Sequence, residues 1–87
     1  MKFIDGIVIT KVGGQQVIVA VGQAARCFQG MIKLNDTAAF IARQLSDDTT
    51  EDRIVGELLG EYEVTEDAAR ANVRKVVSRF TELGLLV

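Results

Sequence analysis

The sequence predicts an α+β domain in which a three-stranded antiparallel sheet is followed by three helices. Two segments rich in β-branched residues, 4–12 and 15–21, flank Gly13-Gly14, a pair typical of a two-residue hairpin turn. The chain changes character at Asn35, and from there apolar residues recur at helical spacing. Because all the strands precede all the helices, the helices are expected to pack together on one face of a small sheet.

The third strand is expected to be short. It covers residues 31–34 and directly follows Gly30, which separates it from the preceding segment. Residues 22–30 fit either a short helical turn or a loop anchored by Phe28, and the pattern leaves both open. Gly6 interrupts the first β-branched segment, which predicts a bulge there.

Capping residues define the three predicted helices. Asn35 is expected to cap the first helix and Thr65 the third, since both side chains accept hydrogen bonds from a helix start. Thr49, with Asp52 three residues later, resembles a capping box at the start of the second helix. Gly84 comes just after the last apolar residue of the third helical pattern, which is the position that glycine favours at a helix C-terminus. The apolar tail after it is expected to fold back onto the core.

The composition argues against several classes of function. The 87 residues include no histidine and one cysteine, so the usual general base and the commonest metal ligand are both missing. A domain of this size has room for one core and a shallow groove rather than a deep, walled active site. We therefore expect a single domain over residues 1–87 that binds a partner without catalysis, cofactor or metal.

Charge and cysteine content bear on partners and compartment. The net charge is −2, which argues against a partner dominated by phosphate, because nucleic-acid affinity comes mainly from Lys and Arg. One cysteine cannot form an internal disulfide, whereas a secreted domain of this size usually contains several disulfides. We expect a cytoplasmic protein, with no signal peptide and no membrane contact.

The residues most able to take part in chemistry have structural explanations. Cys27 has no histidine to activate it, so we expect an ordinary half-buried thiol. The acidic pairs at 47–48 and 51–52 flank a helix start, where the helix dipole stabilises negative charge. Gly13-Gly14 lies between two strands, whereas a phosphate-binding loop leads from a strand into a helix.

Two elements suggest a binding surface. The third helix has no acidic residue between positions 68 and 81, and its four cations there are Arg70, Arg74, Lys75 and Arg79. They form either a solvated face, a helix that contacts DNA, or the basic wall of a peptide groove. The third strand, if it is a sheet edge, has free main-chain groups that pair with an incoming peptide unless a loop covers them.

An ordered set of segments resembles one known family. The segments are residues 30–41 (GMIKLNDTAAFI), 49–55 (TTEDRIV), 59–64 (LGEYEV) and 80–86 (FTELGLL). Together they span about residues 15–87 and resemble the PqqD family, which is named for a protein of pyrroloquinoline-quinone biosynthesis.

The resemblance implies a winged-helix-like domain that recognises ribosomally made, modified peptides. Such a domain binds the leader segment of a precursor peptide and presents it to a modifying enzyme, often a radical S-adenosylmethionine enzyme. The leader is expected to add as a strand in the cleft between the third strand and the third helix. Carried onto this chain, the peptide-binding residues are Gly30, Met31, Ile32, Lys33 and Leu34, with Arg70, Val73, Arg74 and Val77 as outward residues of the helix.

Two other functions stay open beside this one. A winged-helix DNA-binding protein is disfavoured, because the chain is acidic and its hairpin carries only Lys11 near the turn. A homodimerising module without a peptide ligand is harder to exclude, since an exposed edge strand can pair with its own copy.

Overall fold

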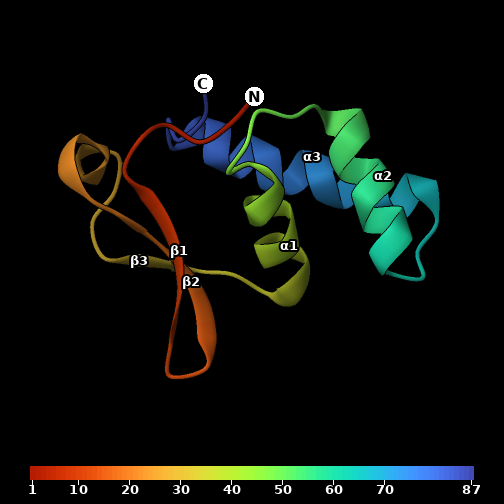
Figure 1. Ribbon diagram of the computed structural model, residues 1–87, viewed down its shortest axis with the longest axis horizontal. Helices are drawn as coiled ribbons and strands as arrows, with labels where there is room; N and C mark the ends of the chain where they lie inside the picture. Colours follow the sequence, from red (N-terminus) through yellow and green to blue (C-terminus); the bar gives the residue numbers. More distant parts are fainter.

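The computed structural model describes all 87 residues and contains one sheet followed by three helices (Figure 1). The strands are β1 (Ile7–Val12), β2 (Gln15–Ala20) and β3 (Met31–Lys33), and the helices are α1 (Asp36–Gln44), α2 (Glu51–Glu61) and α3 (Glu66–Glu82). The sheet is antiparallel in the order β1-β2-β3. The predicted α+β order of three strands and three helices is therefore confirmed.

The β1–β2 hairpin turns at Gly13-Gly14 as predicted. Both glycines have positive φ angles, +58° and +81°, which is the conformation that a two-residue hairpin turn requires. The first strand begins later than predicted, at Ile7, because Gly6 forms a turn with φ +93° instead of a bulge within the strand. Ile4, before this turn, leaves the sheet and donates its N–H to the carbonyl of Leu85.

The segment that the sequence left open, residues 22–30, contains a short 3-10 helix, η1 (Gly22–Arg26). Ala24 on η1 is buried, and Cys27 and Phe28 pack against the core. β3 then ends one residue earlier than predicted, although Leu34 still donates its N–H to β2.

Two of the three predicted helix caps are confirmed. The Asn35 side chain accepts from the N–H of Ala38 at 2.8 Å, and Thr65 caps α3 in the same way. The prediction that Thr49 caps the second helix is wrong, because Thr50 accepts from the N–H of Arg53. Thr49 instead lies in the extended chain before α2, where its N–H binds the carbonyl of Met1.

The C-terminal end of α3 reverses the chain. Gly84 has φ +76° and donates to the carbonyl of Thr81, while Leu85 donates to the carbonyl of Phe80. This pair of bonds is a Schellman motif, which satisfies carbonyls that the helix end would leave unpaired. The tail folds back as predicted, and Leu86 pairs with Phe3.

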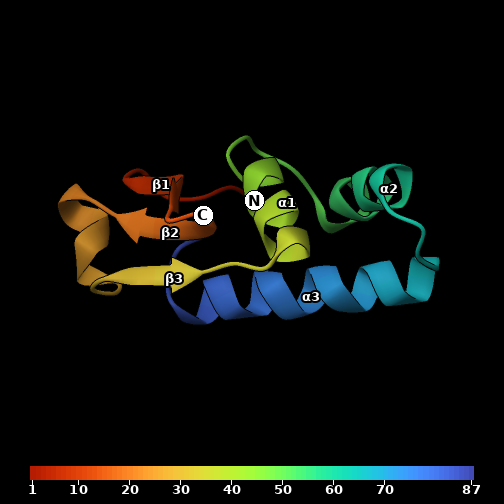
Figure 2. The same cartoon turned by 90° about the horizontal axis from the view of Figure 1, so that it is seen from below.

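The core joins the sheet to all three helices and to the C-terminal tail. α3 runs beneath the other elements for most of the length of the molecule (Figure 2). The largest fully buried side chains are Phe80, Ile18, Ile41, Leu45, Ile54, Leu58, Leu85, Val17, Val55 and Val73. No polar side chain is buried. None of the helices has the length and apolar character that a membrane crossing requires.

Candidate functional site

The outer edge of β3 has unpaired main-chain groups. Leu34 donates its N–H to Gln16 of β2 at 2.9 Å, and Ile32 lies opposite Ile18 in the same register. Hydrogen bonding alternates along an antiparallel strand, so residues 32 and 34 bond to β2 and residues 31 and 33 point the other way. The N–H and C=O groups of Met31 and Lys33 therefore face an open sheet edge.

A shallow groove of about 290 Å³ lies where β3 and the start of α1 meet α3. Both β3 and α3 run along the long axis of the molecule (Figure 2). The apolar residues of the groove are Leu34, Ala38, Val76 and Phe80, and the polar ones are Lys33, Asn35, Thr37, Asn72, Lys75 and Arg79. The groove thus combines an open strand edge, an apolar surface and a polar rim.

The three cations at this groove have no acidic partner. Lys33, Lys75 and Arg79 take part in none of the ion pairs of the molecule. No Asp or Glu lines the groove. The local charge is therefore positive although the whole chain is acidic, and an anionic group is attracted to this site.

The other two predicted cations of α3 face a different neighbour. Arg70 contacts Glu51 and Asp52 of α2, each at 2.9 Å, and Arg74 contacts Glu51 at 2.8 Å. The hydrogen bonds that the Arg70 guanidinium donates to Asp52 and then to Glu51 raise its pKa. Arg70 lies roughly 180° around the helix from Arg79, since nine residues at 3.6 per turn make two and a half turns. Arg70 and Arg74 therefore link α3 to α2 on the flank away from the groove.

Val73 and Val77 also differ from the prediction. Val73 is fully buried on the core face of α3, together with Ala69 and Phe80, so the prediction that it points outward is wrong. Val77 is half-buried and packs against the same core. The residues of α3 that do line the groove, and that were absent from the predicted site, are Asn72, Lys75, Val76, Arg79 and Phe80.

Of the five predicted residues around β3, Lys33 and Leu34 line the groove, and Gly30, Met31 and Ile32 do not. Ile32 and Leu34 are buried against the core, while Met31 and Lys33 are exposed. Gly30, just before the strand, has φ +83°, a conformation that glycine adopts without strain. Their role as peptide contacts stays a prediction.

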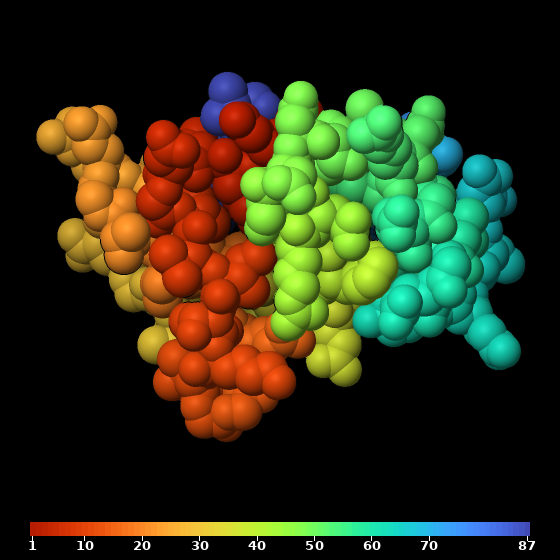
Figure 3. Space-filling model, in the orientation of Figure 1, coloured from red at the N-terminus to blue at the C-terminus, as the bar shows by residue number.

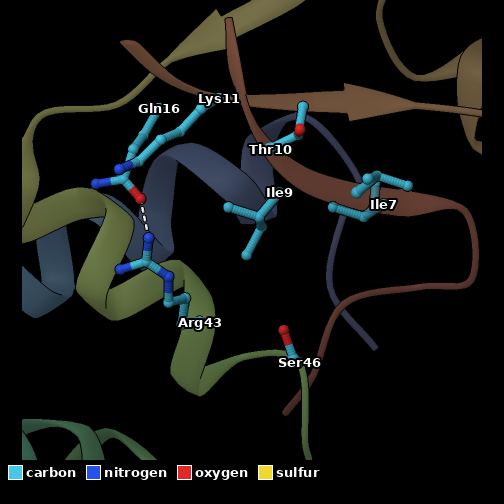
Figure 4. Close-up of a pocket in the computed structure, with 8 residues that line it drawn as sticks. Ile7, Ile9, Thr10, Lys11, Gln16, Arg43 and Ser46 are labelled. Carbon is cyan, nitrogen blue, oxygen red and sulfur yellow. Dashed lines mark hydrogen bonds between the residues drawn. The ribbon is translucent and has the colours of Figure 1, made fainter. Parts of the chain in front are cut away.

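A second hollow lies on the opposite edge of the sheet, between β1 and α1, on the face that Figure 3 shows. This hollow is open to solvent, and Gln16 and Arg43 are among the residues that line it (Figure 4). Within it, Arg43 donates a hydrogen bond to the side-chain oxygen of Gln16, which joins α1 to β2. Because Arg43, the cation that α1 contributes to this hollow, already has a partner, the hollow is a weaker candidate binding site than the β3 groove.

The remaining reactive side chains have structural contacts. The Cys27 thiol is half-buried and lies 3.8 Å from the carbonyl oxygen of Gly84, at the end of α3. Glu51 and Asp52 begin α2 and pair with the arginines of α3. These contacts agree with the structural explanations inferred from the sequence.

The Glu51 pair predicts a pH dependence of stability. Hydrogen bonds from Arg74 and then Arg70 hold the pKa of Glu51 below its ordinary value of 4.5, against an opposing effect of partial desolvation. In acid, the unfolded chain therefore binds a proton at this carboxyl before the folded chain does. The stabilisation is present above about pH 5 and is lost as the pH falls through the folded pKa.

This dependence is measured by thermal unfolding followed by circular dichroism from neutral pH to about pH 3. We expect the melting temperature of the Glu51→Gln variant to fall less steeply than that of the parent chain. Glu57→Gln on the same helix, whose carboxylate makes no ion pair, is the matched control and should follow the parent. Equal slopes for the parent and Glu51→Gln would contradict the assignment.

Known proteins share the sequence pattern and the fold of this chain. The model of the family described as coenzyme PQQ synthesis protein D (PqqD) matches residues 15–86. The fold is similar to that of TbiB1, solved in complex with the TbiA(beta) leader peptide, with a TM-score of 0.77 and 20% identity over 99% of this chain and 94% of that one. It is also similar to a lasso peptide synthetase B1 complexed with its leader peptide, with a TM-score of 0.73 and 25% identity over 97% and 93% of the two chains. No curated protein matches the chain.

Proposed function

Because the chain belongs to the PqqD family, we propose that it binds the leader segment of a ribosomally made precursor peptide. The observation that carries the proposal is the open edge of β3 above a groove against α3. The two similar structures were solved with leader peptides, which supports the same class of ligand here.

The leader adds as a fourth strand beside β3. The N–H and C=O groups of Met31 and Lys33 offer four main-chain hydrogen bonds, each worth about 0.5–1.5 kcal/mol net. A micromolar complex needs about 8 kcal/mol, and association itself costs several more. Main-chain bonds alone are therefore insufficient, and side chains seated in the groove must supply much of the affinity and all of the specificity.

The bound leader is presented to a modifying enzyme, which we propose to be of the radical S-adenosylmethionine type. We propose that the protein itself acts without catalysis, because the groove holds no carboxylate, imidazole or thiol that could activate its lysine and hydroxyl groups. We propose that this occurs in the cytoplasm. Leader addition at β3 leaves the β1 edge free for the enzyme or for a second copy of the chain.

The experiment is a titration with the synthetic leader segment of the precursor peptide encoded beside this gene. Calorimetry is expected to give micromolar or tighter affinity without added metal or nucleotide. Amide hydrogen exchange then locates the strand. Exchange of the Met31 and Lys33 amide hydrogens should slow on binding. The exchange rates of the Ile32 and Leu34 amides, which already face β2, should change little.

Two results would contradict the proposal. One is the absence of any binding heat together with unchanged exchange at β3. The other is protection at Ile7, Ile9 and Lys11, whose main-chain groups face the open side of β1 in the same alternation. Retardation of random duplex DNA in a gel at moderate salt would instead favour a DNA-binding function.

A further inference from the structure

The unpaired cations of α3 define a charge pattern in the ligand. We propose that the segment bound beside β3 carries two acidic residues separated by one residue, Asp/Glu-x-Asp/Glu, which pair with Lys75 and Arg79. This inference rests on the proposed function, because it specifies the peptide that the same groove takes.

The first support is electrostatic. Lys75 and Arg79 line the groove without an acidic partner, whereas Arg70 and Arg74 on the other flank of the same helix are paired with α2. The two flanks therefore differ in how much positive charge remains available. Lys33 also lines the groove and is unpaired, but its side chain belongs to the outward-facing set of β3, so Lys75 and Arg79 are the cations on the helix side. A ligand of complementary charge is acidic.

The second support is the direction of the peptide side chains. In an added strand, successive side chains point to opposite faces of the sheet. Residues of the leader that follow the orientation of Ile32 and Leu34 point toward the helices, and the intervening ones point outward with Met31 and Lys33. Only alternate residues of the leader therefore reach α3, whether it adds parallel or antiparallel to β3.

The third support is that one turn of α3 and two residues of an extended strand have nearly the same length. Lys75 and Arg79 are one turn apart, so they are separated by ~6 Å along the axis of α3. Two residues of an extended strand advance by ~6.6–6.8 Å. Since β3 and α3 both run along the long axis of the molecule, groove-facing residues i and i+2 of the leader come opposite the two cations (Figure 2).

The apolar surface of the groove sets the neighbouring position. Ala38 and Val76 lie beside the cations and are partly covered by protein, and Leu34 and Phe80 are buried beneath them. A further groove-facing residue of the leader, two positions from the acidic pair, is expected to be apolar. An acidic pair next to an apolar residue is a more selective pattern than charge alone. The apolar surface disfavours a charged side chain, and the cations disfavour an apolar one.

The test is selection of a display library of random twelve-residue peptides on the intact chain. Enriched sequences are expected to contain two acidic residues at spacing i, i+2, and a synthetic copy should slow exchange of the Met31 and Lys33 amides. Recovery of β3-binding peptides without this spacing would overturn the inference and leave the proposed function standing. Recovery of no peptide that protects β3 would count against both.

Matched variants then test the two cations, with affinity measured by fluorescence anisotropy of the labelled synthetic peptide. Replacing both acidic residues by Gln should weaken binding roughly two- to 30-fold, because exposed pairs each contribute about 0.2–1 kcal/mol. Moving one of them to position i+1 loses one pair and should weaken binding by up to about fivefold. Lys75→Glu and Arg79→Glu should weaken it further, since reversal replaces attraction with repulsion. Lys11→Glu at the hairpin makes the same change in net charge and should leave affinity unchanged.

Rescue separates pairing from a general effect of charge. A peptide with Lys at the two acidic positions should bind the Lys75→Glu, Arg79→Glu double variant better than it binds the parent chain. Equal weakening by Lys11→Glu and by the groove variants would reduce the effect to net charge and overturn the proposed pairing.

Discussion

Truncation of Phe80 to alanine is expected to lower the free energy of unfolding by about 3–5 kcal/mol. The ring is buried, and its centroid lies 5.3 Å from that of Phe3, so the truncation leaves a cavity and removes an aromatic contact between α3 and the N-terminal segment. An 87-residue domain has a total stability of roughly 4–13 kcal/mol. One substitution therefore removes a large part of it.

Guanidinium denaturation measures this change, with Val12→Ala as the control. Val12 is 48% exposed at the hairpin, so its truncation should stay within about 0.5 kcal/mol. Phe80→Leu keeps most of the buried volume and should lie between the two. A loss below about 1 kcal/mol for Phe80→Ala would show that the core can collapse around the missing ring. Phe80 also lines the groove, so peptide affinity should fall along with stability.

The elements were predictable because their signals are local. Asn35, Thr65 and Gly84 act within a few residues of their own position, and all three do what the sequence predicted. The start of the second helix was not settled locally, because two threonines are adjacent and Asp52, three residues after Thr49, favoured the one that does not cap the helix. The choice depends on Met1, far away in sequence, whose carbonyl accepts the N–H of Thr49.

The candidate site was predictable only on its strand side. A short β segment after Gly30 predicts a sheet edge, and the sheet order confirms that β3 lies at one. For α3, the 3.6-residue period identifies the core face but does not say which flank lies beside β3. Arg70 and Arg79 are alike in sequence, and only the tertiary contact with Glu51 distinguishes them.

Replacement of Lys33 by proline is expected to weaken leader binding by about 1–3 kcal/mol, or roughly five- to 150-fold, with little loss of stability. The substitution removes the N–H that faces the open edge and leaves a carbonyl of the bound peptide without a donor. Proline is tolerated on edge strands where the missing N–H pointed to solvent, and Ile32 before it is already in the extended conformation that proline favours. A matching substitution at Ile32 would instead remove a bond to β2.

The proline variant must be separated from the loss of the lysine charge, and Lys33→Gln does this because it keeps the N–H. Calorimetry with the same leader segment should rank affinity as parent, then Lys33→Gln, then Lys33→Pro. The difference between the two variants measures the main-chain bond, and the difference between parent and Lys33→Gln measures the charge. If the two variants bind equally well while both unfold as the parent does, the leader makes no bond to the Lys33 amide and strand addition at this residue is refuted.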